Sequence, residues 1–138
     1  MIEFYSETNF KLSQAKELSS WILKIIQQHN KELGELIYVF VDDAYLLNLN
    51  KQFLQHDTLT DIISFDNSLG NLISGEIYIS IPRVQENACL YKQTFADELH
   101  RVMIHGVLHF IGFHDKTEEQ RSQMRELENN ALNQRTLL

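Results

Sequence analysis

Residues 105–115 read His-Gly-Val-Leu-His-Phe-Ile-Gly-Phe-His-Asp, and this stretch is the most informative part of the chain. His105 and His109 are four residues apart, so on an α-helix they project from the same face. Asp115 comes six residues after His109, and on a continuing helix it would face away. Gly112 suits a helix end, because glycine adopts the left-handed backbone that turns the chain back. The stretch predicts a helix that ends near Gly112 and a loop that returns Asp115 to the imidazoles.

Two imidazoles and one carboxylate at this spacing are typical of a metal site. Histidines on an apolar helix face are more often core residues, but the added glycine and third donor favour a metal here. Catalytic zinc sites use three protein ligands and keep one position open, whereas structural zinc sites usually have four ligands rich in cysteine. Cys89 is the single cysteine. We therefore expect Zn²⁺ held by His105, His109 and Asp115, with an activated water and hydrolysis as the chemistry.

Gly106 stands directly after the first histidine. Zinc peptidases of the HExxH type carry a glutamate there as general base. The sequence thus argues against a peptidase. Either the metal hydroxide attacks without such a base, or a group elsewhere in the chain supplies it.

The flanking sequence predicts an α+β domain, a small mixed sheet of about four strands packed by about five helices, with the metal-binding helix at its centre. Alternating or continuous apolar runs predict strands at residues 1–5, 36–41, 61–65 and 76–81. Helical spacing and capping residues predict the helices. The first predicted helix runs through Leu12–Ile26, in a segment closed by Gly34, and the second is capped by Asp42. In the second helix we expect four side chains to face inward, those of Tyr45, Leu46, Leu49 and Phe53. The remaining three are a helix from Pro82 to about Tyr91, the motif helix capped by Thr94, and a helix from Thr117 to Leu132.

Length and composition predict one domain over residues 1–138, because 138 residues with 43% hydrophobic content suffice for a single core. No apolar run approaches the ~20 residues of a membrane span, and the start of the chain lacks a secretory signal pattern, so we expect a cytoplasmic protein. The single cysteine excludes an internal disulfide framework.

The net charge of −7 argues against a general nucleic-acid binder, and we expect neither DNA nor a membrane as a partner.

Three sequence blocks resemble the YbeY endoribonucleases, whose signature reads HGxLHLxGYDH. His105, Gly106, Leu108, His109 and Gly112 match the signature identically. Residues 60–65 are similar to the family's PT[DN]VLSF strand, and residues 75–79 are similar to its G[DE]I strand. The blocks agree in order and spacing, and the resemblance runs over essentially the whole chain.

Two departures from the family pattern fall at functional positions. The third ligand is usually a histidine, whereas alignment on Gly112 places Asp115 there, and His114 stands where the family has aspartate. We expect Asp115 to be the ligand, because it keeps the register of the loop. Leu54 occupies the position of a family arginine suited to phosphate recognition. The resemblance therefore leaves His56, beside Leu54, as a candidate catalytic or phosphate-contacting residue.

The resemblance implies a single-strand-specific, metal-dependent endoribonuclease. It would act in 3′-end maturation of small-subunit ribosomal RNA and in ribosome quality control, with RNA and the small ribosomal subunit as partners. Four basic residues could gather around one cleft, and docking to a larger particle would add affinity. These residues are Lys51, Arg83, Arg101 and Lys116. Two alternatives stay open, a non-haem iron oxygenase with a two-histidine, one-carboxylate triad, and a non-catalytic, metal-braced ribosome-assembly factor.

Several further residues have weaker functional interpretations. Glu76 is expected either to orient a ligand or to pair across the sheet, and Ser64 to line the substrate site. His100 lies off the ligand face, and His29 near a helix end is assigned no chemistry. The acidic residues of the last helix are most simply a solvated face, and they include Glu118, Glu119, Glu126 and Glu128.

Overall fold

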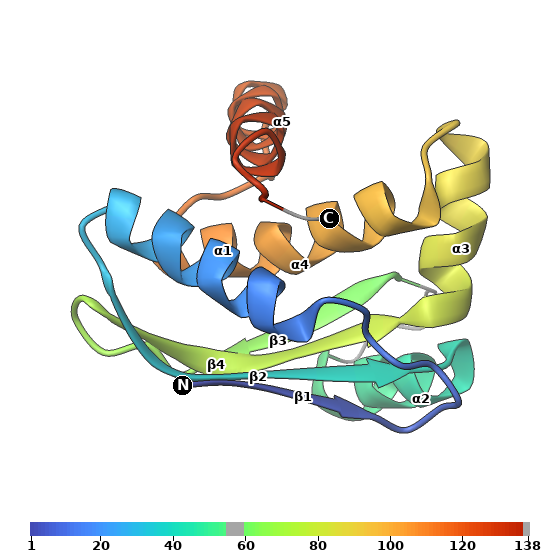
Figure 1. Cartoon of the computed structure of the whole chain (residues 1–138). Helices are drawn as coiled ribbons and strands as arrows, with labels where there is room; N and C mark the ends of the chain where they lie inside the picture. The colour runs from blue at the N-terminus through green and yellow to red at the C-terminus, as the bar shows by residue number, and fades with distance from the viewer. Residues whose placement is uncertain (55–59, 137–138) are drawn as a thin grey trace.

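The computed structural model describes residues 1–54 and 60–136, and it combines one four-stranded sheet with five α-helices (Figure 1). The α+β prediction and the predicted number of elements are confirmed. The elements run in the order β1 (Ile2–Ser6), α1 (Ala15–Gln28), β2 (Glu32–Val41), α2 (Asp43–Leu49), a π-helical turn (Asn50–Leu54), β3 (Ile62–Asp66), β4 (Leu72–Ser80), α3 (Ile81–Leu90), α4 (Phe95–Ile111) and α5 (Glu118–Leu132).

The sheet is mixed, with strand order β1-β2-β4-β3. β1 and β4 both pair with β2 in parallel, and β3 pairs with β4 antiparallel. Alternate residues of β4 are buried, among them Ile73, Ile77 and Ile79, as expected for a strand that turns one face to the core. Figure 1 shows α1 and α4 over that face of the sheet and α5 beyond α4. The metal motif therefore sits on a helix between the sheet and α5.

Helix α4 is the central helix that the sequence predicts. Thr94 caps it by accepting a hydrogen bond from the backbone N–H of Asp97 at 3.0 Å. Buried residues occur on several sides of α4, and the Tyr38 hydroxyl of β2 donates to the backbone carbonyl of Met103 at 2.9 Å. The helix ends at Gly112, whose φ is +125°. A packed element of this kind holds its side chains more rigidly than a surface loop would.

Three expectations about local structure are wrong. Gly34 does not close the first helical segment but lies inside β2, where a Cβ atom would come 2.1 Å from the Oγ of Ser74. The helix ends earlier, at Gln28, and the residue with a positive φ just after it is Asn30, at 60°. Tyr45 and Phe53 do not face inward, with 41% and 62% of their surface exposed.

Candidate metal centre

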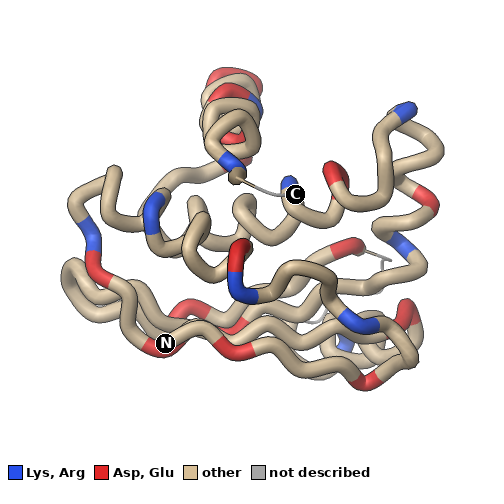
Figure 2. The backbone as a smooth tube through the Cα atoms, in the orientation of Figure 1, with Lys and Arg blue, Asp and Glu red and all other residues tan. Residues whose placement is uncertain are grey.

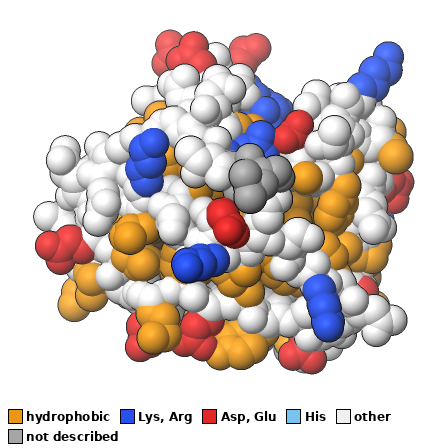
Figure 3. Space-filling model, viewed as in Figure 1, with side chains coloured by type: hydrophobic (Ala, Val, Ile, Leu, Met, Phe, Trp, Pro, Cys, Tyr) orange, Lys and Arg blue, Asp and Glu red, His pale blue; other side chains and the backbone are white. Residues whose placement is uncertain are grey.

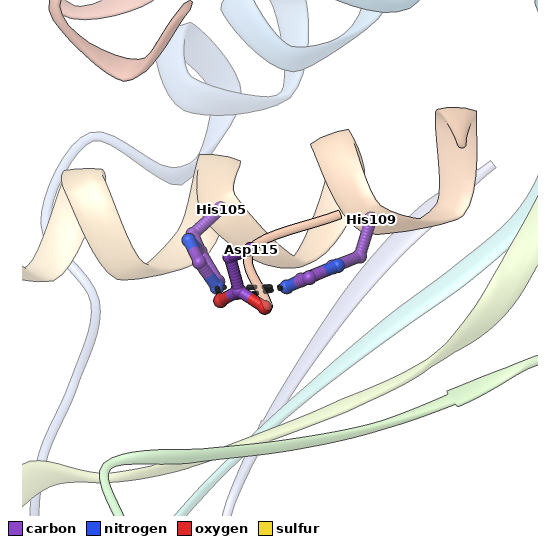
Figure 4. Close-up of side chains that lie close together, drawn as sticks. All are labelled: His105, His109 and Asp115. Atoms are coloured by element: carbon purple, nitrogen blue, oxygen red, sulfur yellow. Dashed lines mark hydrogen bonds and ion pairs between the residues drawn. The ribbon is translucent and has the colours of Figure 1, made fainter. Parts of the chain in front are cut away.

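The side chains of His105, His109 and Asp115 point toward one another (Figure 4). The two imidazoles come from adjacent turns of α4, and Asp115 comes from the loop that follows. Oδ2 of Asp115 lies 3.4 Å from Nε2 of each histidine. The two Nε2 atoms lie 2.9 Å apart. The structure thus brings the three predicted ligand residues together.

The turn at Gly112 delivers Asp115 to this cluster. The backbone N–H of Gly112 donates to the carbonyls of His109 and Leu108 at 3.0 and 3.2 Å, and Phe113 donates to Leu108 at 3.1 Å. These bonds satisfy carbonyls that the end of α4 leaves free. His114 is exposed and stands outside the three-residue cluster.

The spacing of the three donor atoms fits a small divalent cation. A tetrahedral zinc ion with bonds of about 2.0–2.1 Å holds its ligand atoms about 3.3–3.4 Å apart. Both contacts of Asp115 have this length, and the contact between the imidazoles is shorter at 2.9 Å. All three ligand atoms lie within 4.8 Å of one another. The donor set is therefore suited to Zn²⁺ with room for a further ligand.

Gly106 lies against the sheet and leaves no room for a peptidase-type glutamate. A Cβ at this position would come 2.8 Å from Cδ1 of Ile77 in β4 and 3.2 Å from Cδ1 of Ile62 in β3. A longer side chain would have to displace both strands' side chains. The packing explains why glycine follows the first histidine.

Glu128 of α5 contacts the candidate centre, a position that the sequence interpretation missed. It is only 6% exposed, so its assignment to a solvated acidic face is wrong. Its Oε2 lies 2.7 Å from Nδ1 of His105, and its Oε1 accepts a hydrogen bond from Arg101 at 2.9 Å. Helical periodicity could have revealed it, because Glu128 is four residues after Met124 and three before Ala131, both buried.

The surroundings shift the pKa values of these groups. Burial lowers the pKa of His105, but the hydrogen bond to Glu128 and the negative charges around it outweigh burial and raise the pKa. Burial and the neighbouring charge of His105 lower the pKa of His109. Burial raises the pKa of Glu128, yet hydrogen bonds from His105 and Arg101 bring it below its ordinary value. Glu128 is therefore held as a carboxylate.

The centre lies where two surface hollows meet. One, of about 280 Å³, is bordered by His105 and Asp115 and contains the acids Asp61 and Glu98. Burial raises the pKa of both of these acids, neither of which the sequence interpretation assigned to the site.

The second hollow, of about 460 Å³, is bordered by both histidines and by Asp115, together with neutral polar side chains, Asn50, Thr60 and Ser64. The expectation that Ser64 lines the site agrees with this position. Leu54, at the position of the family arginine, borders the same hollow. His56 lies outside the described residues.

The predicted basic residues do not gather around one cleft. Arg83 pairs with Asp43 at 2.9 Å and with Glu86 at 3.0 Å, and it borders neither of the two hollows. Arg101 borders the smaller hollow but is paired with Glu128. Basic residues are scattered along the chain trace and lie mostly apart on the face of the molecule shown (Figures 2 and 3).

Glu76 and His100 are not part of the centre. Glu76 accepts a hydrogen bond from Tyr78 at 3.2 Å and borders a separate hollow beside Gly34. His100 is buried against α1 and contacts Arg135.

The described part of the chain contains no helix long and apolar enough to cross a membrane.

Comparisons with known proteins match this chain to one family over nearly its full length. The family model of endoribonuclease YbeY matches residues 1–136. Proteins named endoribonuclease YbeY from Christiangramia forsetii and Flavobacterium psychrophilum are 51% and 50% identical to this chain. The matches cover 92% and 96% of this chain and 89% and 94% of those proteins, respectively. A solution structure of a Thermotoga maritima protein is similar with a TM-score of 0.66 and 27% identity, and the match covers 96% of this chain and 90% of that one. The resemblance in the sequence blocks is thereby confirmed, and the chain belongs to the endoribonuclease YbeY family.

Proposed function

We propose that this protein is a metal-dependent endoribonuclease specific for single-stranded RNA. It would act in 3′-end maturation of small-subunit ribosomal RNA and in ribosome quality control, in the cytoplasm where ribosomes are made. The observation that carries the proposal is the cluster of His105, His109 and Asp115, whose donor atoms have the spacing of a zinc site and border an open hollow. Membership of the YbeY family supports the substrate class.

In this mechanism His105, His109 and Asp115 would hold one divalent ion, most simply Zn²⁺. When bound, such an ion supplies a Lewis acid for the scissile phosphate and an acidic water for the attack. Glu128 holds the ring of His105 through the 2.7 Å contact. The hydroxyls of Thr60 and Ser64 border the larger hollow and are placed to contact sugar or phosphate oxygens.

The charge of the protein favours docking to a particle over tight binding of free RNA. The chain has a net charge of −7, and the ion pairs of Arg83 and Arg101 already engage two of its basic side chains. Non-specific affinity for RNA depends on free lysine and arginine. We therefore expect weak binding of bare RNA and additional affinity from the small ribosomal subunit.

Two other functions have one observation each in their favour. Two histidines and one carboxylate are also the ligand set of non-haem iron oxygenases. Leu54, in place of the family arginine, borders the hollow and would be consistent with a non-catalytic assembly factor braced by the metal. Bound iron together with 2-oxoglutarate binding would favour the oxygenase. Rescue of ribosome assembly by a cleavage-deficient variant would favour the non-catalytic assembly factor.

A matched pair of histidine variants tests the proposal. His109→Ala should lose both bound zinc and cleavage of single-stranded RNA, because one of three ligands is gone. His114→Ala, at the exposed neighbouring histidine, should retain both. Metal content by elemental analysis and cleavage of single- and double-stranded oligonucleotides provide the measurements. Full nuclease activity of His109→Ala in preparations free of contaminating nuclease would refute the mechanism.

A further inference from the structure

The carboxylate of Glu128 links α5 to two residues of α4. Arg101 and His105 are one helical turn apart, so they project from the same face of α4 toward α5. Oε1 of Glu128 accepts from Nη1 of Arg101 at 2.9 Å, and Oε2 lies 2.7 Å from Nδ1 of His105. Arg101 also donates to Asn129 at 2.7 Å, which holds the guanidinium in place. Both oxygens of a nearly buried side chain are thus assigned to separate partners.

This arrangement determines which nitrogen of His105 carries the hydrogen. A carboxylate only accepts hydrogen bonds, so the contact with Glu128 requires a hydrogen on Nδ1. A neutral imidazole then has its lone pair on Nε2, the atom that faces His109 and Asp115. We propose that Glu128 is the positioning residue of the metal centre, because it fixes the tautomer and the ring orientation in which His105 can bind a cation. The inference rests on the metal centre proposed above.

Arg101 makes the requirement for a carboxylate strict. In a Glu128→Gln variant, only one of the two side-chain atoms could accept a hydrogen bond. If the amide oxygen faced Arg101, the amide nitrogen would donate to Nδ1 of His105 and force the hydrogen onto Nε2, where it blocks the metal. If the oxygen faced His105, the amide nitrogen would confront the donors of Arg101. Either orientation disfavours cation binding.

The test is a titration with Co²⁺, whose visible absorption reports binding to a zinc-type site. Glu128→Gln should bind Co²⁺ about 10–100-fold more weakly than the unaltered protein, the range found when a group that orients a metal ligand is removed. Glu126→Gln, a change of the same chemistry at an exposed position of α5, should bind normally. The double variant Arg101→Met/Glu128→Gln should recover affinity, because the amide oxygen is then free to face His105.

The outcomes separate this inference from the proposed function. Failure of the unaltered protein to bind Co²⁺ would refute the centre itself. Equal binding by the unaltered protein and Glu128→Gln, or no recovery in the double variant, would overturn the positioning role while leaving the centre intact. Nitrogen NMR of the His105 ring in the unaltered, metal-free protein, recorded in the neutral state, is independent of the variants. It should show the hydrogen on Nδ1, and a hydrogen on Nε2 would overturn the inference.

Discussion

His100 should make the stability of the protein depend on pH. This side chain is 6% exposed, and its Nδ1 accepts a hydrogen bond from Arg135 at 2.6 Å. Burial and the positive charge of Arg135 lower the pKa of His100 to about 4, although the nearby Asp97 opposes this shift. In the unfolded chain the pKa is about 6.5. Between these values the unfolded state binds more protons, so the free energy of unfolding falls as the pH decreases.

Linkage gives the size of this loss. It amounts to about 1 kcal/mol by about pH 5.5 and about 2 kcal/mol by about pH 4.5, relative to neutral pH. The assay is urea unfolding of the metal-free protein at several pH values, compared with His100→Gln, which cannot be protonated. Other titrating groups contribute to both proteins and cancel in the difference. A difference that stays constant between neutral pH and about pH 5 would refute the reasoning.

Two glycine positions give further predictions. Gly75→Ala should lower the free energy of unfolding, measured by chemical denaturation, by about 1–3 kcal/mol. The added Cβ would lie 2.4 Å from the carbonyl oxygen of Phe65 and 2.6 Å from the ring of Phe110. Unchanged stability would contradict this packing. Gly112→Ala should lower the free energy of unfolding by about 1–2 kcal/mol, because alanine is strained at a φ of +125°. It should also weaken zinc binding in a competition with a chelator, since the turn at Gly112 returns Asp115 to the histidines. An unaltered zinc affinity would contradict this role of the turn.

Much of the architecture could be predicted because short-range chemistry determines it. Asp42, Thr94 and Thr117 each cap the helix that follows them, as their side chains and positions indicate. The four-residue spacing of His105 and His109 and the glycine after them were sufficient to predict the helix end and the return of the loop. That Asp115 and not His114 faces the imidazoles followed from the register of this loop.

The features that were missed depend on packing between distant segments. Glu128 has the helical spacing of a buried residue, but its contacts with Arg101 and His105 exist only because α5 packs on α4. Gly34 resembles a helix-ending glycine, but it lies in β2, where Ser74 of β4 comes too close to leave room for a Cβ. Phe53 has the spacing of a core residue, yet its side chain is exposed and its ring packs edge-to-face with that of Phe65. Local spacing carries no information about which surface meets a given face.

The most direct test of the metal centre is a crystal structure of the zinc-loaded protein. It should show one ion bound by Nε2 of His105, Nε2 of His109 and a carboxylate oxygen of Asp115 at about 2.0–2.2 Å, with a water or anion in the remaining position. Glu128 should keep its contact with Nδ1 of His105. An ion bound by His114 in place of Asp115, or a fully loaded protein with the ion elsewhere, would contradict the account.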